Sequence, residues 1–261
     1  MAGADLAFAL QLADLADSLS LPRFRARDLR VDTKPDLTPV TDADRAVERA
    51  LRERIAAERP GEGVLGEEEG DDGGPGTAEG GPDLRPGGGG SAAAASSRVR
   101  WIVDPIDGTR NFSRGIPVWA TLIALERDGT LTAAVVSAPA LARRWWASRG
   151  EGAFADGEPI RVSHVSALAD ATVSCSHARD LARVEPVAWH ARGLGDFWQH
   201  VLVAEGAVDA AVDTELELWD SAAVELVVTE AGGRAGIAPD GQFVTTNGHV
   251  HDEVLALLRD R

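Results

Sequence analysis

The chain has 261 residues, of which 44% are hydrophobic, and its 26 Lys+Arg against 42 Asp+Glu give a net charge of −16. This length is enough to bury a substantial core, as one large domain or two closely packed halves. The single cysteine, Cys175, cannot form an internal disulfide, so a small disulfide-stapled module is excluded, and we expect an inert strand residue there. The acidic balance argues against a binder of nucleic acid or anionic lipid, because such proteins depend on a basic surface.

The apolar stretches of the sequence are shorter than a membrane span. The N-terminal residues, Met1-Ala-Gly-Ala-Asp5, lack the basic start and the cleavage site of a signal peptide. We therefore expect a cytoplasmic protein without a membrane partner.

Two helices are predicted in the first sixty residues. Apolar residues recur at three- and four-residue steps from 4 to 21, which is typical of an amphipathic helix, and Pro22 ends it. A second helix begins at Thr41-Asp-Ala-Asp44, whose short oxygen-bearing side chains can cap its first turn, and stops at Pro60-Gly61. Pro35 and Pro39 interrupt the segment between them, which favours an extended edge segment or a loop.

A long compositionally simple segment follows. Residues 70–97 consist mainly of Gly, Pro, Ala, Ser and Asp, and we expect a flexible insertion. The insertion separates two short apolar runs, at 64–69 and 98–104, and each run ends in carboxylates.

Strands and helices alternate in the rest of the chain. Asp128-Gly129 predicts a hairpin turn between two apolar runs, and the same meander continues to residue 157. Further on, 171–176 is strand-like, and 181–192, 221–231 and 252–258 are helix-like. The pattern predicts a layered α/β architecture. We divide it into an N-terminal α+β half at 1–150, which carries most of the acidic site candidates described below, and a C-terminal α/β half at 151–261.

The densest chemical signal lies between Trp101 and Phe112. An apolar run delivers Asp104 to the end of a strand, and Asp107 follows three positions later beside Gly108. Two carboxylates held this close repel each other unless a cation lies between them, and oxygen-only ligands favour Mg²⁺. Gly108 and Thr109 add backbone N–H groups and a hydroxyl that suit a phosphate. The alternative is an ordinary Asp-Pro turn with a capping aspartate.

Two further acidic groups lie where an apolar element gives way to a turn. Glu67-Glu68-Glu69 ends a short apolar run and, taken alone, is compatible with a solvated acidic turn. Asp220 precedes a helix and, taken alone, is compatible with a helix cap. Together with Asp104 and Asp107, these groups indicate a metal-binding nest of carboxylates.

These motifs occur together in one characteristic order: Gly66-Glu67-Glu68, then Asp104-Pro-Ile-Asp-Gly-Thr109, then Trp219-Asp220-Ser-Ala-Ala with Glu230-Ala-Gly-Gly233. The set resembles the inositol monophosphatase superfamily of Mg²⁺-dependent phosphatases. The segment 28–48 is similar to the histidinol-phosphatase branch, which serves histidine biosynthesis in bacteria. The resemblance implies a layered αβαβα sandwich, a homodimer, a small phosphomonoester substrate and two or three Mg²⁺ ions.

The resemblance also implies roles for single residues. Glu67 would bind the first metal and orient the attacking water, and Asp104 would bridge two metals. The carbonyl of Ile106 would complete the first site, while Asp107 and Asp220 would hold the second. Thr109 and Asp44 would polarise the nucleophilic water, although Asp44 alone is also compatible with a helix cap. The phosphate would contact the amides of Gly108 and Thr109, and Ile106, Asp107 and Asp220 would also line the substrate.

Selection of the alcohol is expected from the C-terminal half. Candidates for contact with the substrate are Arg192, Asp196, Trp198 and Asp213, with Glu215 or Glu217 as further carboxylates. Arg192 matches a family arginine near the substrate. Gly195-Asp-Phe-Trp198 replaces the Gly-Thr-Ala stretch of inositol phosphatases, which favours a cationic or aromatic substrate such as L-histidinol phosphate. Alternatively, Phe197 and Trp198 simply pack in the core.

Two other functional hypotheses stay open. A sister activity would hydrolyse inositol 1-phosphate, fructose bisphosphate or a nucleotide 3′-phosphate. A hypothesis from another class is a non-catalytic metal-binding scaffold. The sequence argues against the scaffold, because Glu67, Asp104, Asp107, Thr109 and Asp220 are all chemically intact.

Overall fold

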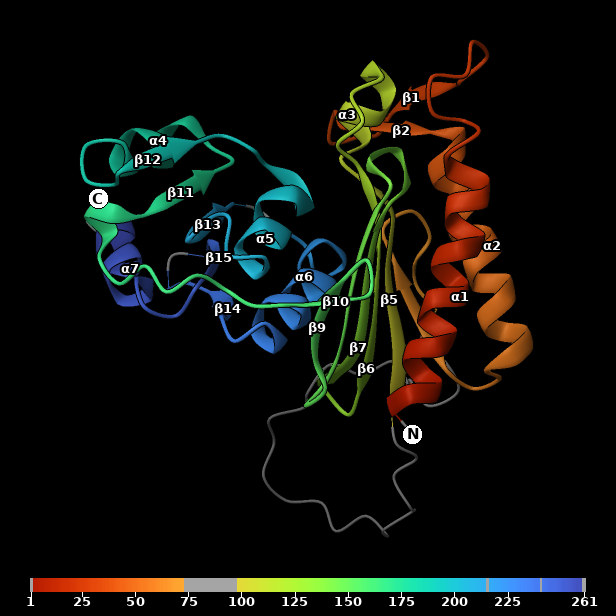
Figure 1. Ribbon diagram of the computed structural model, residues 1–261. Coiled ribbons are helices and arrows are strands. Elements are labelled where there is room, and N and C mark those ends of the chain that lie inside the picture. Colours follow the sequence, from red (N-terminus) through yellow and green to blue (C-terminus); the bar gives the residue numbers. More distant parts are fainter. Residues whose placement is uncertain (1, 73–97, 215, 240, 260–261) are drawn as a thin grey trace, which may run out of the picture.

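The computed structural model describes residues 2–72, 98–214, 216–239 and 241–259. Within these ranges the largest sheet has eight strands in the order β10-β9-β8-β7-β6-β5-β3-β4 (Figure 1). Neighbouring strands are antiparallel except β3 and β5, which are parallel. The bounds are β3 Gly63–Gly66, β4 Gly70–Asp71, β5 Val99–Asp107, β6 Ala120–Arg127, β7 Thr130–Ala138, β8 Arg143–Ser148, β9 Gly152–Ala155 and β10 Glu158–Ile160.

The C-terminal part of the described chain contributes a five-stranded sheet in the order β12-β11-β13-β15-β14. Strand β11 is parallel to both β12 and β13, and β15 is antiparallel to both β13 and β14. The bounds are β11 Thr172–Cys175, β12 His190–Arg192, β13 Ala210–Asp213, β14 Arg234–Ile237 and β15 Phe243–Thr246. A separate hairpin pairs β1 Val31–Thr33 with β2 Pro39–Thr41.

Helices form the layers around the sheets. Their bounds are α1 Ala2–Ser20, α2 Asp42–Glu58, α3 Thr109–Arg114, α4 Ala178–Val184, α5 Asp196–Ala204, α6 Leu218–Glu230 and α7 His251–Arg259, with short 3₁₀ turns at Pro139–Leu141 and Leu168–Asp170. Helices α1 and α2 cover one face of the large sheet, α5 and α6 lie between the two sheets, and α4 and α7 pack on the outer face of the smaller sheet (Figure 1). The predicted αβαβα sandwich is confirmed.

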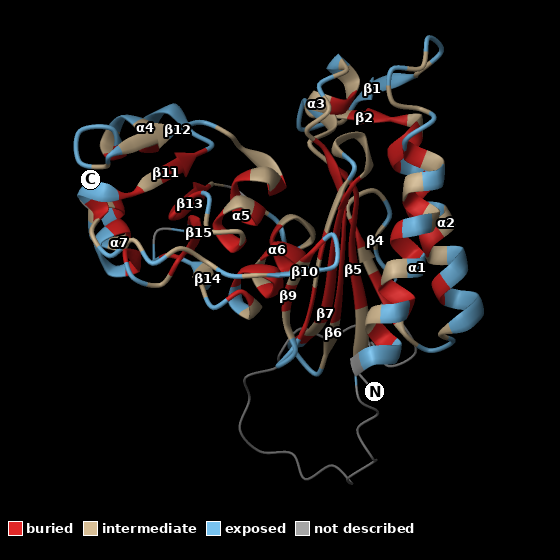
Figure 2. Cartoon of the chain, viewed as in Figure 1, coloured by how far each residue is buried: buried red, intermediate tan, exposed pale blue. Residues whose placement is uncertain are grey.

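The alternation of side chains along β5 shows why this layering forms. Trp101 and Val103 face α1 and α2, whereas Ile102 between them faces α5 and α6. A strand covered on both faces has apolar residues at successive positions, as this strand does. Figure 2 shows the matching pattern on α1 and α2, which are buried toward the sheet and exposed on their outer sides.

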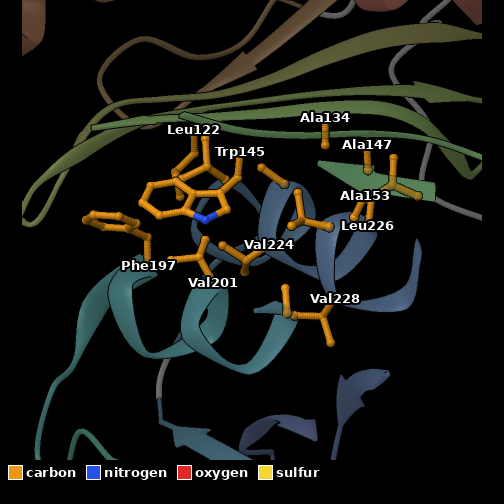
Figure 3. Close-up of a cluster of buried hydrophobic side chains, with 14 of the residues drawn as sticks. Leu122, Ala134, Trp145, Ala147, Ala153, Phe197, Val201, Val224, Leu226 and Val228 are labelled. Carbon is orange, nitrogen blue, oxygen red and sulfur yellow. The ribbon is translucent and has the colours of Figure 1, made fainter. Parts of the chain in front are cut away.

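The central helical layer packs against the large sheet through a cluster that contains Trp145 (Figure 3). Trp145 is fully buried, its ring centroid lies 6.2 Å from that of Phe197, and its indole N–H donates to Glu205 Oε1 at 2.6 Å. Val201 of α5 and Val224 of α6 lie against the same rings. This cluster joins the large sheet to the helices that carry the C-terminal site residues.

We expect Trp145→Ala to lower the free energy of unfolding by about 3–5 kcal/mol, because it removes a large side chain from a close-packed core. Urea unfolding measures the change. Trp189 is 71% exposed and provides the matched control, so Trp189→Ala should change the stability by no more than about 0.5 kcal/mol. Equal losses in the two variants would contradict the packing argument.

Most predicted elements are confirmed, including the two N-terminal helices, the extended segment between them and the hairpin at Asp128-Gly129. The helix predicted over 181–192 is wrong in extent. Helix α4 ends at Val184, Pro186 follows in a turn without an N–H to donate, and His190 then pairs with β11 as the start of β12.

Two other expectations concern the division of the chain. The flexible insertion predicted over 70–97 lies outside the described residues from 73 onward, and its first two residues form β4. The division at residue 150 remains a prediction, and the large sheet itself extends to Ile160. Of the helices described here, none is both long enough and apolar enough to cross a bilayer.

Candidate active site

The centre of the candidate site is the carboxyl end of β5, where Asp104 and Asp107 lie. The register between β5 and β6 shifts between these two aspartates. Pro105 has no N–H to donate, so the ladder cannot continue regularly there. Asp104 is only 2% exposed, and its Oδ1 accepts the N–H of Ile106 at 2.9 Å. This hydrogen bond fixes the bend that directs Asp107 into the same region.

A third carboxylate reaches this region from α6. Asp220 lies in the first turn of the helix, and its Oδ2 accepts the N–H of Glu217 at 2.8 Å. Carboxylate oxygens of Asp104, Asp107 and Asp220 all lie within 4.8 Å of one another. We call these three residues the aspartate cluster. Asp107 is oriented from α5, because the N–H of Phe197 donates to its Oδ2 at 2.7 Å.

The aspartate cluster is electrostatically costly unless a cation neutralises it. Burial raises the pKa of both Asp104 and Asp107 well above the usual range, and the charge of Glu67 raises that of Asp104 further. Burial also raises the pKa of Asp220 to about 7. Groups that are this close must share protons or bind a cation, and an all-oxygen donor set suits a hard divalent ion.

A second group, Asp44, Glu67 and Glu68, also has carboxylate oxygens within 4.8 Å of one another. We call it the glutamate cluster. Asp44 is fully buried in the first turn of α2, where its Oδ2 accepts the N–H of Thr41 at 2.8 Å and also the Thr41 hydroxyl. Burial raises the pKa of Asp44 to about 6, and the charge of Glu67 adds to the increase. Asp44 is therefore both the predicted helix-capping partner and a member of the site.

Thr109 connects the two clusters. Its Oγ1 lies 3.1 Å from Asp44 Oδ1 and 2.9 Å from the carbonyl oxygen of Ile106, so the hydroxyl can donate to either. Gly108 precedes it with φ of 82°, a left-handed conformation that favours glycine. A Cβ at Gly108 would also lie 3.1 Å from the carbonyl oxygen of Val118. The sharp start of α3 thus places the Thr109 hydroxyl beside Asp44.

Two of the predicted substrate residues border the aspartate cluster. Asp196 begins α5 at a φ of 48°, and its Oδ2 accepts a hydrogen bond from Asn111 Nδ2 at 2.9 Å. Asp213 ends β13 and is 7% exposed, and Gln199 Nε2 donates to its Oδ2 at 3.0 Å. Burial raises the pKa of Asp196 to about 6, and the charge of Asp213 adds to it. These carboxylates extend the acidic region from the ends of β5 toward the smaller sheet.

Trp198 and Arg192, which were also predicted to contact the substrate, lie differently, and Glu215 falls outside the described residues. Trp198 is partly buried, and its ring packs edge-on against Trp145 with centroids 5.9 Å apart. Its packing therefore follows the core alternative, and a contact with substrate stays a prediction. Arg192 is exposed at the end of the edge strand β12 and forms no ion pair with a described carboxylate. The structure does not bring Arg192 into either cluster.

A model of the inositol monophosphatase family matches residues 4–254. The chain belongs to the inositol monophosphatase family. It is 49% identical to a protein named histidinol-phosphatase from Mycobacterium tuberculosis over 97% of each chain. It is 42% identical to one of the same name from Streptomyces coelicolor, over 98% of this chain and 97% of that one. The resemblance inferred from the motifs is confirmed, and the chain is a phosphatase of this family.

Solved structures agree on the fold of this phosphatase. The Thermotoga maritima IMPase superposes with a TM-score of 0.83 at 28% identity, covering 98% of this chain and 97% of that chain. The suhB protein of Bartonella henselae superposes with a TM-score of 0.81 at 28% identity, covering 96% of each. Among family members, an inositol-1-monophosphatase from Mesorhizobium japonicum is 34% identical over 89% of this chain and 85% of that one.

The motif analysis assigned no role to Lys34 of the phosphatase. Its Nζ lies 2.8 Å from Glu67 Oε1 and 2.6 Å from Glu68 Oε1. Burial lowers the pKa of this ammonium group, but the hydrogen bonds to the two glutamates outweigh burial and raise it above its ordinary value. One signal was available in the sequence, since Lys34 is the only lysine in the chain.

The aspartate cluster predicts how the stability of the metal-free phosphatase depends on pH. Asp220 has a folded pKa of about 7 against an ordinary 3.8, so between these values the folded state holds more protons than the unfolded chain. The stability that protonated Asp220 contributes to the folded state is therefore complete below about pH 4 and is lost as the pH rises through about 7. We expect urea unfolding in EDTA to show a shallower loss of stability over this window in Asp220→Asn than in the wild type. Parallel profiles would contradict this.

Proposed function

We propose that this phosphatase hydrolyses L-histidinol phosphate to L-histidinol and phosphate in a Mg²⁺-dependent reaction, as a step of histidine biosynthesis. The chemistry is carried by one observation: elements far apart in the sequence bring two carboxylate clusters together at the end of β5. The substrate is supported by relatives named histidinol-phosphatase, which are 40–49% identical to this chain.

The donor set fits Mg²⁺, because the clusters offer only oxygen ligands, and because burial and neighbouring carboxylates raise the pKa of Asp104 and Asp220, so a bound cation would favour their charged forms. Glu67, Asp104, Asp107, Asp220 and the carbonyl of Ile106 are the residues that would hold it. Bound there, two or three ions would make a water nucleophilic and stabilise the negative charge of the phosphoryl group and the leaving oxygen.

Asp44 and Thr109 would orient the attacking water. The Thr41 N–H and hydroxyl both hold Asp44 Oδ2, which leaves Oδ1 facing the Thr109 hydroxyl at 3.1 Å. When the Thr109 hydroxyl donates a hydrogen bond to Asp44, its lone pairs remain free to accept a hydrogen bond from the water. The water oxygen can then approach the phosphorus in line with the departing alcohol oxygen. Both side chains are preorganised, since each is held by a residue three positions earlier in the chain, Asp44 by Thr41 and Thr109 by the carbonyl of Ile106.

Asp196 and Asp213 would select the alcohol. Histidinol phosphate carries an amine and an imidazole, and both become cations that pair with carboxylates. The two aspartates lie at the start of α5 and the end of β13, next to the aspartate cluster that would receive the phosphate. Inositol 1-phosphate has only neutral hydroxyls on its ring and gains less from this acidic region. Contacts of the substrate with Trp198 and Arg192 remain part of the proposal.

A panel of phosphomonoesters tests the substrate. Purified protein with Mg²⁺ is assayed for phosphate release from histidinol phosphate, inositol 1-phosphate, fructose 1,6-bisphosphate and a nucleotide 3′-phosphate. We expect kcat/KM for histidinol phosphate to exceed each of the others by about 100-fold, which corresponds to roughly 2.7 kcal/mol. A higher kcat/KM for inositol 1-phosphate would overturn the substrate while leaving the metal chemistry in place.

Asp196→Asn tests the selecting charge. Asparagine tolerates the positive φ at this position and keeps the shape of aspartate, so the change removes mainly the negative charge. We expect KM for histidinol phosphate to rise about tenfold or more, as for a lost charge-assisted hydrogen bond, and KM for inositol 1-phosphate to change much less. A similar rise for both substrates would show that Asp196 does not discriminate between them.

A further inference from the structure

A fully buried carboxylate lies outside both clusters, one helical turn after Asp44. Glu48 of α2 is 0% exposed, and its two oxygens accept four N–H donors. The N–H of Glu68 donates to Oε2 at 2.7 Å and the N–H of Glu69 donates to Oε1 at 3.0 Å. Arg52 donates to Oε1 through Nε at 2.9 Å and Nη2 at 2.8 Å. A buried charge is tolerated only with such partners.

The two backbone donors belong to the turn that carries Glu67. Residues 67–69 connect β3 to β4, and β4 has only two residues, so the ladder that supports this turn is short. Arg52 holds the far side of the same hairpin, because its guanidinium also donates to the carbonyl oxygens of Gly70 and Val64. Helix α2 therefore holds the turn through one ion pair, in which Glu48 accepts its N–H groups and Arg52 donates to the strands on either side of it.

Gly66, the last residue of β3 before the turn, leaves the space that the Glu48 carboxylate occupies. A Cβ built on Gly66 would lie 2.3 Å from Glu48 Oε1 and 2.5 Å from its Cδ, far closer than atoms can approach. Only a glycine leaves room for the carboxylate to reach under the turn. Glycine is therefore required at position 66 because any side chain would clash with Glu48, and not because of its backbone conformation.

We propose that Glu48, held by Arg52, is a positioning residue for the glutamate cluster. The proposal rests on the proposed function, in which Glu67 is a metal ligand. Glu48 acts through the backbone N–H groups of Glu68 and Glu69, and these fix the direction in which Glu67 leaves the turn. Asp44 lies on the same helix, so α2 both supplies one member of the cluster and sets the position of the others.

Glu48→Gln tests this role. The side chain keeps its shape, but an NH₂ group replaces one of the two acceptor oxygens and faces a donor. We expect the dissociation constant for Mn²⁺, followed by electron paramagnetic resonance, to rise about tenfold to a hundredfold, as when groups that orient metal ligands are lost. The Mg²⁺ concentration for half-maximal phosphate release should rise in parallel, while KM for histidinol phosphate at saturating Mg²⁺ stays near the wild-type value. Glu53 is exposed on the same helix, so Glu53→Gln makes the same change of charge and should match the wild type.

Folded Glu48→Gln that binds Mn²⁺ as tightly as the wild type would overturn the proposal. If circular dichroism shows that this variant does not fold, Arg52→Lys replaces it, since lysine keeps the charge but cannot reproduce the fork of donors. Unchanged Mn²⁺ binding in Arg52→Lys would then overturn the proposal, and weaker binding would support it. A different result would refute the proposed substrate without refuting the role of Glu48. A wild type that binds Mn²⁺ more tightly than Glu48→Gln but releases no phosphate from histidinol phosphate refutes the substrate and leaves the role of Glu48 standing.

Discussion

Asp104→Asn is expected to lower phosphate release by roughly a thousandfold or more, which corresponds to at least about 4 kcal/mol of transition-state stabilisation. Asp104 lies at the buried end of β5, and its carboxylate is within 4.8 Å of Asp107 and Asp220. Asparagine keeps an oxygen that can accept the N–H of Ile106, so the bend is retained while the charge that would bridge two cations is lost. Steady-state assays at several Mg²⁺ concentrations measure the effect.

The same variant has a second expected result that separates loss of charge from loss of fold. Burial and the neighbouring carboxylates raise the pKa of Asp104, so removing its charge should increase the free energy of unfolding in EDTA at neutral pH. Asp180 is a buried aspartate in α4, paired with Arg183 at 3.5 Å and outside both clusters. Asp180→Asn is the matched control and should retain phosphatase activity. Near wild-type activity in Asp104→Asn would refute the bridging role.

Removal of divalent cations is expected to abolish phosphate release completely and reversibly. Every side chain in the two clusters is a carboxylate, and no Lys or Arg among the described residues forms an ion pair with the aspartate cluster. Dialysis against EDTA should therefore stop turnover, and added Mg²⁺ should restore it. Binding should also stabilise the fold, by about 2.7 kcal/mol at a free Mg²⁺ concentration of 100 times Kd. Thermal unfolding with and without Mg²⁺ measures this shift.

The control for metal removal is Asp104→Asn itself. Its melting temperature should respond much less to Mg²⁺ than that of the wild type, because the ligand proposed to be shared between the ions is gone. Phosphate release that persists in excess EDTA would contradict a metal-dependent mechanism. A Mg²⁺-induced stabilisation of equal size in both proteins would place the cation elsewhere on the molecule.

The local part of the site could be predicted because its residues are contiguous in sequence. Asp104, Asp107 and Thr109 lie within six positions, and the proline and glycine between them dictate a bend at a strand end. The start of the helix that carries Asp44 was also readable, since capping residues precede apolar periodicity. The helix at Asp220 starts earlier than expected, at Leu218, because Glu217 caps it and Asp220 lies within its first turn. That these pieces converge was an inference from motif order, and the hydrogen bond between Thr109 and Asp44, which are 65 residues apart, agrees with it.

Contacts between residues far apart in the sequence could not be predicted. The role of Glu48 depends on the closeness of α2 to a turn about twenty residues further on, although its spacing of four from Asp44 on a mostly apolar helix face was a partial signal. The link from Asn111 to Asp196 spans 85 residues and joins helices on either side of the site. The helix predicted over 181–192 was too long for another reason. The prediction gave more weight to the apolar periodicity than to Pro186, which cannot donate a helical hydrogen bond, and the helix ends at Val184.

The single lysine of this chain makes the neighbourhood of Glu67 and Glu68 chemically distinctive. Besides the N-terminal amine, Lys34 provides the only primary amine that an acylating or reductively alkylating reagent can modify. Fluorophores, biotin tags or resins coupled through amines therefore attach either at an α-amino group or beside Glu67 and Glu68. Coupling at neutral pH, where the α-amino group is the more reactive of the two, leaves the phosphatase centre untouched.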